Sequence, residues 1–138
     1  MAAAADVKVG SVVRGSENFT SQQGAVYPPG ICAETVGSTG VFLGKVTIPP
    51  GSRTKAHLHE AHESAYCMLG GEEVEVFTGD RLENRAVVRP GDYWFIPGKV
   101  PHIAVNRGTT PAVFIGARKE PTAKESQVMR PELDALVP

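Results

Sequence analysis

Short runs of β-branched and aromatic residues, separated by glycine and proline, follow one another along most of the chain. Such runs favour strands, and turns spaced roughly every 8 to 12 residues are typical of all-β proteins. No segment has convincing helical periodicity, although residues 124–136 allow a turn or two near the C-terminus. The pattern predicts strands within residues 40–48, 63–69, 72–80, 83–88, 93–97, 102–106 and 112–118, and a further β-type run at 31–38.

About eight short strands predict an all-β fold, either a sandwich or a closed antiparallel barrel. The chain has 138 residues, which is enough for one domain with a single core. We expect the barrel to span residues 31–120. Residues 1–30 and 121–138 are predicted to form N- and C-terminal arms that lie over it.

Composition narrows the choice of partners and compartment. The formal net charge is −1, so neither a nucleic-acid surface nor an acidic tail is expected. No apolar run approaches the roughly 20 residues that cross a bilayer, and the first ten residues do not resemble a signal peptide. Cys32 and Cys67 are too few for a disulfide scaffold and are expected to be reduced thiols. These features predict a cytoplasmic protein without a membrane partner.

Three of the four histidines lie within residues 51–71, which also contain Glu63. His57 and His59 are separated by one residue, so on a strand they lie about 6.6 Å apart on the same face. Both imidazoles can then reach one metal ion at about 2.0–2.1 Å. If the backbone stays extended or bends once, the Glu63 carboxylate returns to that face. One strand cannot surround an ion, so a fourth ligand must come from elsewhere.

The remaining histidine, His102, opens the predicted strand 102–106 after a proline-containing loop. We predict a metal site formed by His57, His59, Glu63 and His102, with Glu63 also the candidate catalytic proton acceptor. This donor set suits one divalent transition metal per chain: Fe, Mn, Ni or Zn, with Co and Cu also possible. It suits Ca²⁺ and Mg²⁺ poorly, because they prefer oxygen ligands. The segment HEAHE is not a zinc-protease motif, since its histidines lie one residue too close.

Two segments resemble the sequence motifs of the cupin family. The first motif is matched at every fixed position by Gly51, His57, His59, Glu63 and Gly70. The second motif is matched by Gly91, Pro97, His102 and Asn106. One position departs from the second motif, because the family usually has glycine where this chain has Lys99. The geometry of the loop before His102 is therefore the part of the motif that the resemblance specifies least.

The cupin resemblance implies a small jelly-roll-like barrel of antiparallel strands, with a metal inside near one open end. It assigns ligand roles to His57, His59, Glu63 and His102, which occupy the matching motif positions. It further implies a small-molecule substrate or ligand. Single-domain cupins often pair through sheet faces and terminal arms, so a homodimer is also expected.

The resemblance leaves several functions open. Cupins with three histidines and one glutamate resemble dioxygenases most often, so the first expectation is a metal-dependent enzyme that acts on a small oxygenated organic molecule. A metal-dependent sugar isomerase, epimerase or lyase is an alternative. A non-catalytic cupin that binds a small ligand is the other. The sequence shows no Ser-His-Asp set or phosphate-binding loop that would offer competing chemistry.

Other polar side chains have weaker claims on the site. His62 is expected to face away from the metal, because its parity along the strand is opposite to that of Glu63. Lys45 is expected to be exposed rather than to bind an anionic substrate, and Cys67 to be a small buried residue rather than a cavity wall. Asn106 is expected to fix the turn after His102. The aromatic residues expected to pack a core or a dimer face, with one available as a pocket wall, are Tyr66, Tyr93, Trp94 and Phe95.

Overall fold

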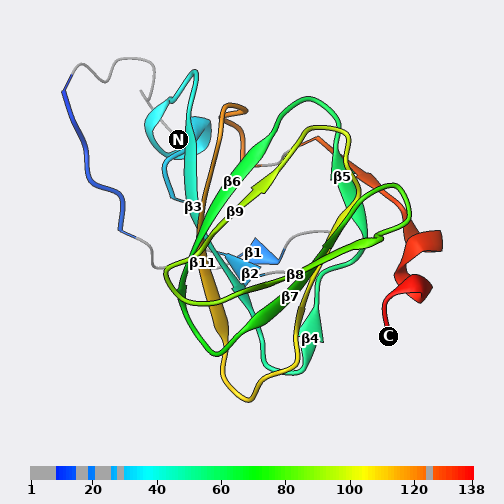
Figure 1. The fold of residues 1–138 in the computed structure, drawn as a ribbon. Helices are drawn as coiled ribbons and strands as arrows, with labels where there is room; N and C mark the ends of the chain where they lie inside the picture. The colour runs from blue at the N-terminus through cyan, green and yellow to red at the C-terminus, as the bar shows by residue number, and fades with distance from the viewer. Residues whose placement is uncertain (1–8, 15–18, 21–25, 28–29, 124–125) are drawn as a thin grey trace.

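The predicted all-β architecture is confirmed by the structure, a computed structural model (Figure 1). In the described part of the chain, antiparallel strands form two sheets, joined by short turns and accompanied by one short α-helix and one 3₁₀ helix. The described residues are 9–14, 19–20, 26–27, 30–123 and 126–138. Much of the predicted N-terminal arm, residues 1–8, 15–18, 21–25 and 28–29, therefore lies outside them.

The first sheet has the strand order β1-β2-β3-β11-β6-β9. Its strands are β1 (Phe19–Thr20), β2 (Val26–Tyr27), β3 (Phe42–Ile48), β11 (Ala112–Arg118), β6 (Ser64–Gly70) and β9 (Tyr93–Ile96). The central strand β11 pairs along its whole length with β3, and with β6 on its other side. Neighbours in this sheet are therefore mostly segments that are far apart in the sequence.

The second sheet has the strand order β12-β5-β10-β7-β8, and β4 also pairs with β10. Its strands are β12 (Gln127–Met129), β5 (His57–His59), β10 (His102–Asn106), β7 (Val74–Thr78), β8 (Asn84–Val88) and β4 (Ser52–Arg53). β5 has only three residues and is flanked on both sides, by β10 and by β12. The C-terminal segment therefore supplies a strand to the sheet that carries two of the candidate ligands.

One predicted β-type run is wrong. Residues 31–38 form an isolated bridge at Ile31, followed by the one-turn helix α1 (Ala33–Val36). Local hydrogen bonds explain the helix, because the Thr35 hydroxyl accepts from the Cys32 amide at 3.1 Å and donates to the Gly30 carbonyl at 2.7 Å. Gly37, with φ of 71°, ends the turn in the left-handed conformation that favours glycine.

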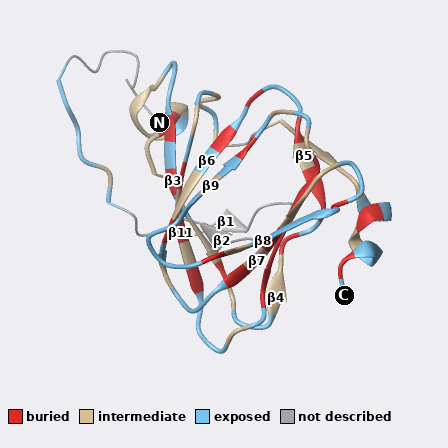
Figure 2. Ribbon diagram, in the orientation of Figure 1, coloured by how far each residue is buried: buried red, intermediate tan, exposed pale blue. Residues whose placement is uncertain are grey.

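The main core fills the space between the two sheets. Burial alternates over the first four residues of β3, where Figure 2 shows red and blue in turn, because one face of the sheet packs inward. The buried cluster consists of Ile48, Met68, Val74, Val76, Val88, Ala104, Ala112 and Phe114. Burying a large apolar side chain contributes roughly 1.5–3 kcal/mol. This cluster therefore holds the sheets face to face.

β10 is buried on both faces, because the C-terminal residues cover its outer side. The 3₁₀ helix η2 (Pro131–Leu136) follows β12 and packs there. Arg53 fixes this segment by donating to the carbonyls of Asp134 at 2.9 Å and Val137 at 2.6 Å. The second buried cluster consists of Ala56, Leu82, Ile103, Val105, Leu133 and Val137. Within the described residues, no helix is both long and apolar enough to cross a membrane.

Asn106 closes the end of β10 with its side-chain amide. Its Nδ2 donates to the carbonyls of Ile48 at 3.0 Å and Thr110 at 2.9 Å, while its Oδ1 accepts from the Gly108 amide at 3.0 Å. Asn106 is 1% exposed, so these bonds form out of contact with water. The expectation that Asn106 fixes the turn after His102 is confirmed.

We predict that Asn106→Ala lowers the free energy of unfolding by about 3 kcal/mol, because it leaves buried backbone groups without their partner. Chemical denaturation monitored by circular dichroism measures this loss. Asn84→Ala is the matched control: Asn84 is exposed, so its removal changes stability by less than about 0.5 kcal/mol. Equal losses in the two variants would contradict the structural role of Asn106.

Candidate metal centre

Three histidines meet between the sheets at one end of the fold. His57 and His59 project from β5, and His102 opens the neighbouring strand β10, where it is paired with His57. One ring nitrogen from each of the three lies within 4.8 Å of the others. All three side chains are buried. The alternation along β5 places both of its histidines inward and leaves Leu58 between them half-buried.

Hydrogen bonds on the opposite ring nitrogen orient these imidazoles. The Nδ1 of His57 donates to the Lys55 carbonyl at 2.7 Å, and the Nδ1 of His102 donates to the Val100 carbonyl at 3.0 Å. A carbonyl oxygen only accepts, so in each neutral ring the proton lies on Nδ1 and the lone pair on Nε2. The Nδ1 of His59 lies 3.2 Å from the hydroxyl of Ser64. Partners of this kind are typical of metal-binding histidines.

The donor set fits a transition metal. Three neutral imidazoles suit Zn, Fe, Ni, Co or Cu, and protein sites with three ligands leave at least one position for water or substrate. The rings pack closely, with centroids 4.3 Å apart for His57 and His102 and 4.7 Å apart for His59 and His102. Three buried imidazoles converging in this way form a pocket of nitrogen donors.

Glu63 lies outside this group of donor atoms. It is exposed and lines an open surface hollow of about 710 Å³, together with Glu60 and Lys99. β5 ends at His59 and β6 begins at Ser64, so residues 60–63 form a bend rather than a continuous strand. Strand parity does not carry across a bend, and in the structure Ser64, not Glu63, faces the buried His59. The assignment of Glu63 as a ligand stays a prediction.

His62 lies inside, against the expectation that it faces away. Its ring stacks on His59 with centroids 4.8 Å apart and an interplanar angle of 17°. Its Nδ1 lies 3.7 Å from a carboxylate oxygen of Glu120, and its side chain is only 3% exposed. The same bend explains the error, because it turns His62 inward and Glu63 outward. The only sequence feature that pointed to His62 as part of the site was its closeness to His59. That closeness does not specify the direction of the His62 side chain.

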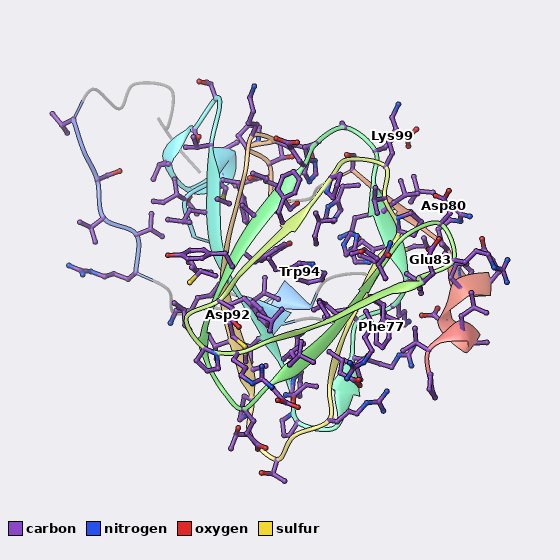
Figure 3. All side chains as sticks on the ribbon, viewed as in Figure 1. Phe77, Asp80, Glu83, Asp92, Trp94 and Lys99 are labelled. Carbon is purple, nitrogen blue, oxygen red and sulfur yellow. The ribbon has the colours of Figure 1, made fainter. Side chains whose placement is uncertain are left out.

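The loop before His102 has Lys99 at the position where the second motif usually has glycine. Lys99 adopts a φ of 64°, the left-handed conformation that usually requires glycine. Its amide donates to the His59 carbonyl at 2.7 Å, which ties the loop to the end of β5. Figure 3 shows Lys99 on this loop at the end of the fold. The loop is therefore anchored beside the histidines although the motif glycine is absent.

A small cavity of about 30 Å³ adjoins the histidine group. The residues that line it are Val46, Ile48, Thr54, His57, Tyr66, Trp94, Ile96, His102, Ala104 and Phe114. We refer to this cavity as the inner chamber. Two of the four aromatic residues with a predicted packing role, Tyr66 and Trp94, are walls of the chamber, and Figure 3 shows Trp94 between the sheets. Lys45 is exposed, as expected, and Cys67 is half-buried outside the chamber.

Two facing antiparallel sheets with three histidines close together between them define a class of small β-proteins with an internal group of candidate metal ligands. The family described as the cupin domain matches residues 44–117. The chain therefore belongs to the cupin family.

One relative is similar to this chain in sequence, and two solved structures share its fold. An uncharacterized protein of Methanocaldococcus jannaschii, MJ1618, is 30% identical over 83 residues, which are 60% of this chain and 63% of that protein. The oxalate decarboxylase of Lactobacillus farciminis, solved as a formate complex, superposes with a TM-score of 0.68 at 18% identity, over 88% of this chain and 36% of its own. A putative sugar phosphate isomerase of Acidithiobacillus ferrooxidans has a TM-score of 0.59 at 21% identity, over 75% of this chain and 66% of its own. The chain thus spans less than two thirds of these relatives' lengths.

We predict that Ser64→Ala weakens metal binding by about tenfold, because it removes the hydroxyl beside the Nδ1 of His59. Competition with a chromophoric chelator measures the affinity. Ser52→Ala is the matched control, since Ser52 pairs with Asn106, at the opposite end of β10 from His102. An unchanged affinity in Ser64→Ala would show that this hydroxyl does not orient the ligand.

Proposed function

We propose that this cupin is a metal-dependent enzyme that acts on a small oxygenated organic molecule, with dioxygenase-type chemistry first. The observation that carries the proposal is the convergence of the buried rings of His57, His59 and His102 beside the inner chamber. A site held by three protein nitrogens keeps positions for substrate. A metal bound there would supply Lewis-acid or redox chemistry.

The chain's own residues have distinct roles in this proposal. His57, His59 and His102 would hold the ion through the nitrogen opposite each hydrogen-bonded Nδ1. The apolar walls of the inner chamber keep bulk water from the reacting groups. Glu63 is the proposed fourth ligand and proton acceptor, and an inward shift of the bend 60–63 would bring its carboxylate to the ion.

Two alternatives are kept. The superposition with a putative sugar phosphate isomerase favours a metal-dependent isomerase, epimerase or lyase as the second candidate. A non-catalytic cupin that binds a small ligand through the metal is the third. The three candidates share the same site, and they differ in what the bound molecule undergoes.

The proposal predicts about one transition metal per chain in protein purified without a metal resin, measured by elemental analysis. The variant with both His57→Ala and His59→Ala should retain none, because it loses two of the three nitrogens, and circular dichroism checks that it folds.

Glu63→Gln should weaken metal binding by about tenfold, whereas Glu60→Gln, on the same exposed bend, should leave it unchanged. Metal retained by the double variant would refute the site, and equal behaviour of the two glutamine variants would refute the role of Glu63.

The reaction class is tested in the same preparation. Fe(II)-loaded protein should consume O₂ with at least one member of a panel of diketones, catechols, flavonols and thiols, and the double histidine variant should not. Absence of uptake with every member would refute the dioxygenase assignment. Turnover of sugar phosphates by the metal-loaded protein would then support the isomerase. If sugar phosphates are not turned over either, the result would support the non-catalytic binding role.

A homodimer is proposed as the working form. The outer face of the first sheet exposes Leu43, Leu69, Tyr93 and Phe95, which we refer to as the outer apolar face. Leu69 is 52% and Phe95 is 57% exposed, and Tyr93 pairs with Cys67 across β9 and β6. Apolar side chains gathered on one sheet face are typical of protein–protein contacts.

We predict that the combined change Leu69→Glu and Phe95→Glu converts the protein from a dimer to a monomer of 14.6 kDa, because it places charges in the contact. Sedimentation analysis measures the mass. Val12→Glu is the control, since Val12 is 74% exposed and lies on the extended segment 9–14, which is drawn in blue and lies apart from the sheets in Figure 1. A monomeric parent protein, or a dimeric double variant, would contradict this interface.

A further inference from the structure

The walls of the inner chamber are apolar on nearly every side. Val46, Ile48 and Phe114 come from the first sheet's central strands, and Trp94 and Ile96 from its edge strand β9. No Lys, Arg, Asp or Glu among the described residues lines the cavity. A charged group placed there would lose its hydration without gaining an ionic partner.

The polar groups of the lining have tasks of their own. The Thr54 hydroxyl accepts from the Ala104 amide at 2.9 Å and is thus tied to β10. His57 and His102 are in the proposed ligand set, and their Nδ1 atoms donate to backbone carbonyls. Tyr66 and Trp94 add a phenol and an indole ring to the lining. The chamber therefore presents imidazoles at one side and mostly apolar side chains on the others.

The charged side chains near the site lie in a different place. Glu60, Lys99, Lys119 and Glu120 line the open surface hollow that also contains Glu63, and His62 borders it. His62 stacks on His59, so its ring lies between this hollow and the histidine group. The charged side chains of the hollow therefore lie on one side of the proposed metal site, and the apolar walls of the inner chamber lie on the other.

The size of the chamber limits what enters it. A cavity needs roughly 10–15 Å³ of volume open to a water-sized sphere in order to hold one water-sized group. The chamber of about 30 Å³ therefore holds a chain of two or three carbon-sized groups. Gly116 helps to fix this size, because a Cβ there would come within 2.5 Å of the Tyr66 ring and push the ring from its place.

We propose that the inner chamber receives a short, uncharged alkyl arm of a substrate whose oxygens bind the metal. The inference rests on the proposed metal site and deepens it by naming the substrate class. It selects against molecules that carry a second charged group in the position of the arm, and against arms much longer than three carbons.

Hydroxamic acids with different tails test the arm separately from the metal-binding head. Full-length protein loaded with Co(II) is titrated with butyrohydroxamate, with succinic acid monohydroxamate, in which a carboxylate replaces the terminal methyl, and with hexanohydroxamate. Calorimetry and the visible spectrum of Co(II) report binding. We expect butyrohydroxamate to bind at least tenfold more tightly than either of the others, because the charged tail is desolvated and the long tail does not fit.

Two variants of opposite effect test the chamber itself. Val46→Ala enlarges the chamber. The ratio of the affinity for butyrohydroxamate to the affinity for hexanohydroxamate should therefore fall by about tenfold. Ala104→Val fills it and should weaken butyrohydroxamate by at least tenfold, while leaving acetohydroxamate unchanged. Val113→Ala is the matched control, since Val113 neighbours Phe114 on β11 but does not line the chamber. Its affinities should equal those of the parent protein.

The outcomes separate this inference from the metal site. A protein that binds Co(II) but takes the charged and uncharged tails equally well would overturn the inference and leave the proposed metal site standing. Equal tail preferences in Val46→Ala and Val113→Ala would overturn the inference in the same way. A protein that binds no Co(II) would overturn the metal site and, with it, the inference.

Discussion

The antiparallel pairing of β5 with β10 is the constraint on which the site depends. β5 has three residues and would not hold a strand conformation alone, because so short a segment makes few hydrogen bonds. It is fixed by β10 on one side, where His57 lies opposite His102, and by β12 on the other. This double pairing turns histidines from two distant segments into one group. The C-terminal strand β12 therefore supports the site, although none of the predicted ligands lies on it.

The same pairing sets the polarity of the interior. β10 is buried on both faces, so its inward residues lie between the sheets while its outward residues pack under the C-terminal helix. Buried imidazoles in such surroundings need hydrogen-bond partners. The carbonyls of Lys55 and Val100 provide them at the Nδ1 atoms of His57 and His102, and one nitrogen from each of the three histidine rings lies within 4.8 Å of the others. Beyond the histidines the chamber is lined mostly by apolar side chains and by no charged one among the described residues, which gives the chamber its proposed preference for an uncharged arm.

Much of the fold could be predicted from the sequence, because strand signals are local. Runs of β-branched residues bounded by Gly and Pro predicted seven strands close to their observed bounds, namely β3 and the six strands β6 to β11. The exception, α1, forms where the side chain of Thr35 competes for backbone groups and outweighs the β propensity of the run. The short strands β1, β2 and β4 carry too few residues for a periodic signal. β12 was expected only as part of an arm, since it forms through pairing with β5.

For the site, the sequence by itself determined the residue types and their spacing: two histidines at a strand period, a third behind a proline-containing loop, and a carboxylate nearby. Only the tertiary structure decided the directions of the side chains on the bend 60–63, where His62 turns inward and Glu63 outward. It also decided that Lys99 takes a left-handed conformation in place of the motif glycine. The physical reason is the same in both cases. Periodicity fixes direction only while the backbone is regular, and in a bend or loop the direction is set by contacts with residues that are distant in the sequence.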